Sequence, residues 1–119
     1  MDVNCVVYRT VSVIGKKWSL LIVLSIRKGG LRERRYSEIR KDLPRISPRM
    51  LSAKLKALEK EGIIRKRIDY SSIPPGVYYS LTPAGKKLIP FLRGLKKWGL
   101  EWKFDSQDCQ RRECRRCTV

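Results

Sequence analysis

Residues 45–67 constrain the fold more than any other segment, because they combine a sharply defined helix with a strongly basic end. Ser47 is a good N-cap, and Pro48 follows at the first helical position, where the missing N–H of proline costs nothing. Gly62 marks the end of the helix. On a helical wheel, leucines occupy one face and basic residues flank an alanine on the other: Leu51, Leu55 and Leu58 against Arg49, Ala53, Lys56 and Lys60. The pattern predicts a helix with one face in the core and a basic face in solvent.

A shorter helix precedes this segment and a hairpin follows it. Ser37 is a candidate N-cap for the run EIRKDL, and residues 43–46 form a turn. After Gly62 come two strand-like runs, IIRKRIDY and VYYSL, joined by the turn-forming SSIPPG. Helix, turn, helix and hairpin in this order predict an α+β fold, a winged helix-turn-helix.

Further helices are predicted at both ends of the chain. Residues 3–14 carry valines at helical spacing, residues 17–27 are apolar on nearly all sides, and the glycine pair 29–30 stops this second helix. Thr82 and Pro83 repeat the N-cap and N1 pair and begin a last helix. Its large apolar residues are Leu88, Phe91, Leu92, Leu95, Trp98 and Trp102.

Two features of the terminal helices bear on assembly. Pro90 should kink the last helix by deleting a backbone hydrogen bond, unless that helix begins later. The first and last helices also carry more large apolar side chains than one small core needs, so we expect them to form the two-fold interface of a homodimer. The alternative is that Trp98 and Trp102 cover their own domain.

The charge of the chain indicates its partner. With 119 residues the chain has the size of one domain, and 28 Lys and Arg against 11 Asp and Glu give a net charge of +17. Such an excess favours a polyanion, with DNA first and an anionic membrane surface second. The alternative is an ion-paired surface, although such surfaces mix both signs.

Other functions are excluded by residues that the sequence lacks. It has no histidine, P-loop, dinucleotide-binding glycine motif or G-x-S-x-G element, so we expect neither an enzyme nor a cofactor. Its longest apolar run, residues 20–26, is too short to cross a bilayer, and no signal peptide opens the chain. We therefore expect a cytoplasmic protein without membrane association.

The basic face of the helix that begins after Ser47 suits the major groove of double-stranded DNA, which admits one helix. Arg49 can bind guanine through two hydrogen bonds, the Ala53 methyl can lie against a thymine methyl, and Lys56 can reach guanine or phosphate. Ser47 and Ser52 can donate to phosphate. The alternative for each of these cations is a solvated face.

The hairpin offers a second set of DNA contacts. Strand alternation puts Arg65 and Arg67 on one face and Lys66 on the other. The tip, residues 70–75, has no positive charge. We therefore expect Arg65 and Arg67 to bind phosphate and the tip to make only shape contacts in a minor groove.

With these residues in view, the chain resembles the HxlR-type winged-helix transcription regulators, relatives of the MarR group. The matching stretches are Cys5 and the runs IGKKWSLLIVLSI, RRYSEIRKDLPRISPRMLSAKLKALEKEGIIRKR, PPGVYYSLTPAGKKL and IPFLRGLKKWG. The resemblance implies a homodimer that binds a pseudo-palindromic operator, with its recognition helix at residues 47–61. It also accounts for Pro90, because the family tolerates a proline there.

The cysteines lie at the two ends of the chain. Cys5 matches the position where some members of the resembling family keep a redox- or electrophile-sensing thiol, and the alternative is an inert, partly buried thiol. Cys109, Cys114 and Cys117 lie in a basic tail, residues 105–119, that follows the predicted domain of residues 1–104. Their spacing leaves three interpretations open: a metal or iron–sulfur site, disulfide chemistry, or a tail without redox function.

These observations together predict a homodimeric, sequence-specific DNA-binding regulator of transcription that responds to redox state or electrophiles through cysteine. One alternative is an architectural nucleoid protein that coats DNA without sequence preference. A second is a protein-interaction adaptor built on the winged-helix fold.

Overall fold

The structure is a computed structural model that describes residues 2–28 and 33–105. Its helices are α1 (Val6–Ile14), α2 (Lys17–Arg27), α3 (Tyr36–Asp42), α4 (Pro48–Lys60), α5 (Pro83–Lys86) and α6 (Ile89–Trp102), and its strands are β1 (Arg34–Arg35), β2 (Ile64–Asp69) and β3 (Gly76–Leu81). The strands form an antiparallel sheet in the order β1-β3-β2. The predicted α+β winged helix-turn-helix is confirmed. The glycine pair expected to stop the second helix lies outside the described residues.

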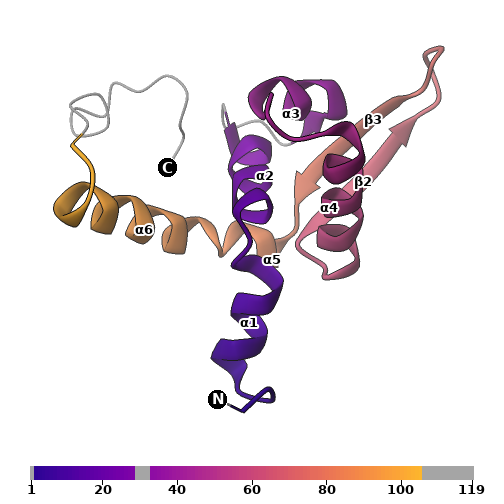
Figure 1. The fold of residues 1–119 in the computed structure, drawn as a ribbon. Coiled ribbons are helices and arrows are strands. Elements are labelled where there is room, and N and C mark those ends of the chain that lie inside the picture. The colour runs from indigo at the N-terminus through magenta and orange to yellow at the C-terminus, as the bar shows by residue number, and fades with distance from the viewer. Residues whose placement is uncertain (1, 29–32, 106–119) are drawn as a thin grey trace.

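Helix α2 lies at the centre of the core. Its Ile22, Val23 and Ile26 are at most 1% exposed and pack in one cluster with side chains from α3, α4 and the sheet. The predicted leucine stripe of α4 joins this cluster: Leu51, Leu55 and Leu58 are all buried. In Figure 1, α2, α3 and α4 gather beside the sheet, the β2–β3 hairpin projects from the body, and α1 and α6 extend away from it.

The start and end of α4 follow the predicted local signals. The Ser47 side chain accepts a hydrogen bond from the backbone N–H of Met50 at 3.1 Å, and Pro48 is the first helical residue. Gly62 has a φ of 76°, the left-handed conformation that favours glycine just after a helix. Capping and termination set the length of α4, and its buried leucines set which face is turned outward.

The prediction that Ser37 is the N-cap of the short helix before α4 is wrong. Helix α3 begins at Tyr36, with Arg35 as its N-cap residue. The backbone N–H of Arg35 donates to the Glu38 carboxylate at 3.0 Å, so the side chain at the third helical position satisfies the free donor. Pairing of β1 with β3 keeps Arg35 extended, and the helix can begin only after it.

The last predicted helix is divided in two. Thr82 caps α5 by accepting from the N–H of Gly85 at 3.2 Å, and α5 ends at Lys86. Helix α6 begins at Ile89, so Pro90 lies in its first turn, where a missing N–H breaks no intrahelical bond. Of the two outcomes expected for Pro90, the structure therefore shows the later helix start and not a kinked helix. The first helix also begins later than predicted, at Val6 rather than Val3.

Candidate nucleic-acid interface

The outward face of α4 is exposed and basic. Arg49, Ser52, Ala53 and Lys56 are all exposed, opposite the buried leucines of the same helix. Within residues 2–28 and 33–105, neither Arg49 nor Lys56 forms an ion pair. The four side chains predicted to meet DNA from this helix thus lie on one accessible face.

Helix α4 packs against α2 and β2, and a separate polar network holds the short helix α3 that precedes it. Asp42, at the end of α3, accepts from the Ser25 hydroxyl at 2.7 Å and from Lys28 Nζ at 3.0 Å, and it pairs with Arg34 Nη2 at 2.5 Å. Burial opposes ionisation of Asp42, but these hydrogen bonds and the charges of Arg34 and Lys28 outweigh it and lower the pKa. The network joins α2, β1 and α3 around one carboxylate.

The hairpin has two chemically different faces. Arg65, Lys66 and Arg67 of β2 pair with Ser80, Tyr79 and Tyr78 of β3. The face that carries Lys66 also carries the buried Ile64 and is turned toward the core; we call it the inner face. Arg65 and Arg67 lie on the outer face, as the alternation predicts.

Arg67 is engaged by other residues of the chain. Its Nη2 and Nε lie 2.6 and 3.1 Å from the two carboxylate oxygens of Glu33, and its guanidinium lies 4.7 Å from the centre of the Tyr78 ring. The hydrogen bonds lower the pKa of Glu33 and raise that of Arg67. Arg65 is exposed and has no such acidic partner among the described residues. The two predicted phosphate ligands therefore differ in availability.

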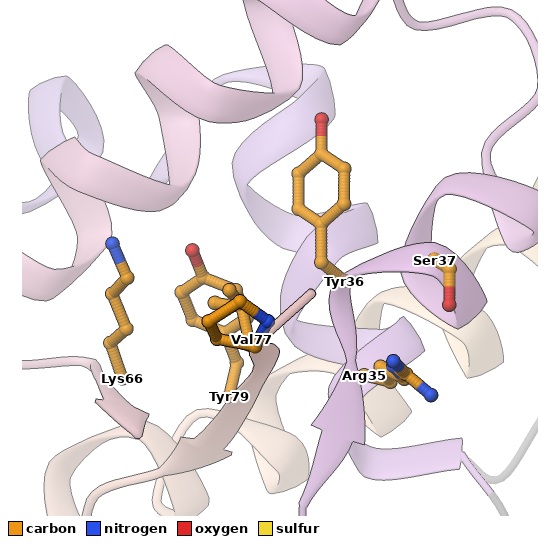
Figure 2. A pocket seen from close by; sticks show the side chains of 7 residues that line it. Arg35, Tyr36, Ser37, Lys66, Val77 and Tyr79 are labelled. Carbon is orange, nitrogen blue, oxygen red and sulfur yellow. The ribbon is translucent and has the colours of Figure 1, made fainter. Parts of the chain in front are cut away.

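A pocket that the sequence did not indicate lies between α3 and the hairpin (Figure 2). It has a volume of about 400 Å³, and its lining residues are Arg35, Tyr36, Ser37, Lys66, Pro75, Val77 and Tyr79. The Tyr36 hydroxyl lies 3.5 Å from the Ser52 hydroxyl of α4. Strand alternation had separated Lys66 from the two arginines, but no local pattern indicated that Tyr36 would lie on the same side of the sheet.

Tyr79 forms part of this pocket and is only 7% exposed. Its burial, with smaller contributions from Glu59 and Tyr36, raises the pKa of its phenol. Tyr79 is therefore a hydrogen-bond donor at neutral pH.

The two terminal helices expose a large apolar surface. Trp98 and Trp102 of α6 are 54% and 70% exposed, so they do not cover their own domain. The other exposed large hydrophobic residues of the two helices are Val6, Val7, Tyr8, Val11, Phe91 and Leu95.

Cys5 is half-buried at the N-cap position of α1 and carries a free thiol. Cys109, Cys114 and Cys117 lie outside the described residues. Within the described part of the chain, no group of histidine, cysteine or acidic side chains is arranged to hold a metal ion. None of the helices described there is both long and apolar enough to span a membrane.

Known proteins share this architecture. The chain is similar to the HTH-type transcriptional regulator YdeP of Bacillus subtilis (strain 168), with 37% identity over 100 residues, 84% of this chain and 75% of that protein. A second HTH-type transcriptional regulator, from Methanothermobacter thermautotrophicus (strain Delta H), is 41% identical over 95 residues, 80% of this chain and 70% of the other.

Solved structures of transcriptional regulators are also similar to this chain. A MarR-family transcriptional regulator from Porphyromonas gingivalis W83 superposes with a TM-score of 0.76 at 38% identity, covering 86% of this chain and 96% of that one. The redox regulator HypR in its oxidised form gives 0.72 at 37% identity, covering 86% and 100%. The model of the HxlR-like helix-turn-helix family matches residues 13–107. The chain belongs to this family, and it is a transcriptional regulator with a helix-turn-helix rather than an enzyme.

Proposed function

We propose that this regulator binds a specific DNA operator as a homodimer. The observation that carries the proposal is the exposed face of α4, on which Arg49, Ser52, Ala53 and Lys56 stand over a stripe of buried leucines. A helix that reads base edges needs one face packed firmly in the core and basic side chains free to reach DNA on the opposite face.

Each residue has a role in the proposed complex. Arg49 binds guanine, Ala53 lies against a thymine methyl, and Lys56 reaches guanine or phosphate. Ser47 and Ser52 donate to phosphates and set the register of the helix. On the hairpin, Arg65 is available to bind phosphate. Arg67 can bind phosphate only after it breaks its hydrogen bonds to Glu33.

The homodimer is proposed to form through α1 and α6. Their exposed valines, phenylalanine, leucine and tryptophans form a surface of the kind that protein interfaces bury. A two-fold dimer places two recognition helices on operator half-sites about 34–36 Å apart. In this arrangement residues 1–104 form the DNA-binding and dimerisation domain, residues 105–119 form a basic tail, and the protein acts in the cytoplasm.

The test is selection of bound duplexes from a random pool, followed by affinity measurements on the selected operator and on random DNA. Arg49→Ala should weaken operator binding by about 1–3 kcal/mol and relax the base preference at one position. Equal affinity of the wild-type protein for operator and random DNA would instead favour the nucleoid alternative. Intact DNA binding by Arg49→Ala with loss of a protein partner would favour the adaptor.

A redox response through Cys5 is a separate part of the proposal. Cys5 is a free thiol at the start of a helix proposed to form the dimer, so its modification would disturb that interface. Similarity to the redox regulator HypR also supports it. Oxidant should change the operator affinity of the wild-type protein but leave that of Cys5→Ser unchanged, and an equal response of both proteins would refute a role for Cys5.

A further inference from the structure

We propose that Lys66 and Tyr36, in the pocket between α3 and the hairpin, bind the phosphate backbone that runs between the major groove and the neighbouring minor groove. The inference rests on the proposed DNA binding and adds two residues to the phosphate contacts of that complex. Neither belongs to the set that the sequence predicted for phosphate.

The position of the pocket relative to DNA follows from the geometry of the duplex. Adjacent major and minor grooves are separated by a sugar–phosphate strand. If α4 occupies a major groove and the hairpin reaches the next minor groove, that strand crosses the surface between the two elements. The pocket borders that surface: its walls are α3 and the hairpin, and the Tyr36 hydroxyl lies 3.5 Å from the Ser52 hydroxyl of α4.

The register of the sheet turns Lys66 toward this surface. Lys66 pairs with Tyr79 and shares the inner face of β2 with Ile64, which is 2% exposed. In Figure 2 the side chains of Lys66, Tyr79 and Tyr36 project in the same direction, whereas the Arg35 side chain points away from them. The pocket thus gathers one ammonium group and phenolic hydroxyls from separate elements.

The chemistry of the lining fits an anion. None of the side chains lining the pocket is acidic, and Lys66 is exposed and has no ion-pair partner in the described part of the chain. Tyr36 and Ser52 can each donate a hydrogen bond to a phosphate oxygen. On the outer face, by contrast, the Arg67 guanidinium already holds the carboxylate of Glu33. Among the described residues, Lys66 is therefore a cation without an ion-pair partner on the inner face of the hairpin.

The experiment measures affinity for the selected operator and for a random duplex over a range of salt concentrations. Lys66→Gln should weaken binding to both duplexes roughly tenfold and make the slope of log affinity against log salt shallower by about 1.8, because each of the two subunits loses one phosphate contact. Lys66→Arg should keep both the affinity and the slope. Lys86→Gln removes the same charge from an exposed site on α5 and should leave the slope unchanged.

Tyr36→Phe provides a second, independent variant. It removes only a hydroxyl, so binding should weaken about 2- to 10-fold on both duplexes with an unchanged salt slope. Circular dichroism melting of each variant verifies that it is folded.

The outcomes separate this inference from the proposed function. If the wild-type protein selects an operator but Lys66→Gln behaves like Lys86→Gln, the phosphate role of Lys66 is wrong and the proposed function stands. If Lys66→Gln loses affinity for the operator alone, Lys66 reads bases and the assignment to phosphate is overturned. If the wild-type protein shows no preference for any duplex, the proposed function itself fails.

Discussion

At the scale of single residues, the ion pair between Arg67 and Glu33 neutralises one of the basic side chains of the hairpin. Two short hydrogen bonds join the side chains, and the Tyr78 ring lies under the guanidinium. A phosphate can bind Arg67 only by displacing an anion that is already in place. We therefore expect Glu33 to weaken DNA binding in the proposed complex.

Replacing Glu33 by Gln should strengthen DNA binding. The variant frees Arg67 in both subunits of the proposed dimer, so we expect higher affinity for operator and random duplexes and a salt slope steeper by about 1.8. Glu101→Gln on α6 makes the same change of net charge away from the hairpin and serves as the control. Equal effects of the two variants on the salt slope would show that only net charge matters.

Gly85 is a second position where one residue decides the local structure. A Cβ there would collide with the backbone oxygen of Ile63, the same carbonyl to which the Thr82 hydroxyl donates at 3.0 Å. Gly85→Ala should therefore lower the free energy of unfolding by about 1–3 kcal/mol. Gly94→Ala, in open space on α6, should raise it by about 0.4–1 kcal/mol. Chemical denaturation of both variants measures the difference, and destabilisation of equal size in both would contradict the steric explanation.

At the scale of elements, the carboxylate of Asp42 sets the position of α3 relative to α2 and β1. It receives hydrogen bonds from Ser25 and Lys28 and pairs with Arg34. The first helix of the helix-turn-helix is thus fixed to α2 and β1 by one partly buried carboxylate.

This arrangement predicts a loss of stability in acid. The pKa of Asp42 is lower in the folded than in the unfolded protein, so its contribution is complete above about pH 4, the ordinary range for Asp. It is lost as the pH falls through the lower folded value. The free energy of unfolding should therefore decline below about pH 4, and less steeply in Asp42→Asn. Glu101→Gln is the matched control, and an acid decline in Asp42→Asn as steep as in this control would contradict the assignment.

At the scale of the whole molecule, α1 and α6 project from a core that is already complete. The buried cluster is built from α2, α3, α4, the sheet and the first turn of α6, while the outer part of α6 exposes its tryptophans. The described residues therefore present an exposed apolar surface on α1 and α6 and an exposed basic surface on α4.

Charging the apolar surface should break the proposed dimer. Trp98→Glu should sediment as a monomer and bind the full operator roughly a hundredfold more weakly, because the two half-sites are no longer held together. Its affinity for a single half-site should stay close to that of the wild-type protein. Ile73→Glu alters a 99% exposed residue at the hairpin tip and should remain dimeric. A dimeric Trp98→Glu variant would place the interface elsewhere.

Much of the fold could be predicted from the sequence because its signals are local. Ser47, Pro48 and Gly62 bound a helix by the chemistry of their own backbones, and a leucine stripe on that helix has one side to bury. The start of α3 could not be predicted in the same way, because it depends on pairing between β1 and a strand far along the chain.

The sequence by itself determined the helix-turn-helix, the hairpin and the basic outer face of α4, since caps, periodicity and strand alternation act over a few residues. Only the tertiary structure decided which of the hairpin's cations are free. Arg67 is held by Glu33, which lies 34 residues away, and Lys66 is turned into a pocket beside Tyr36. Charges separated along the chain meet only after the sheet has formed, so their pairing follows from the register between strands and not from any local pattern.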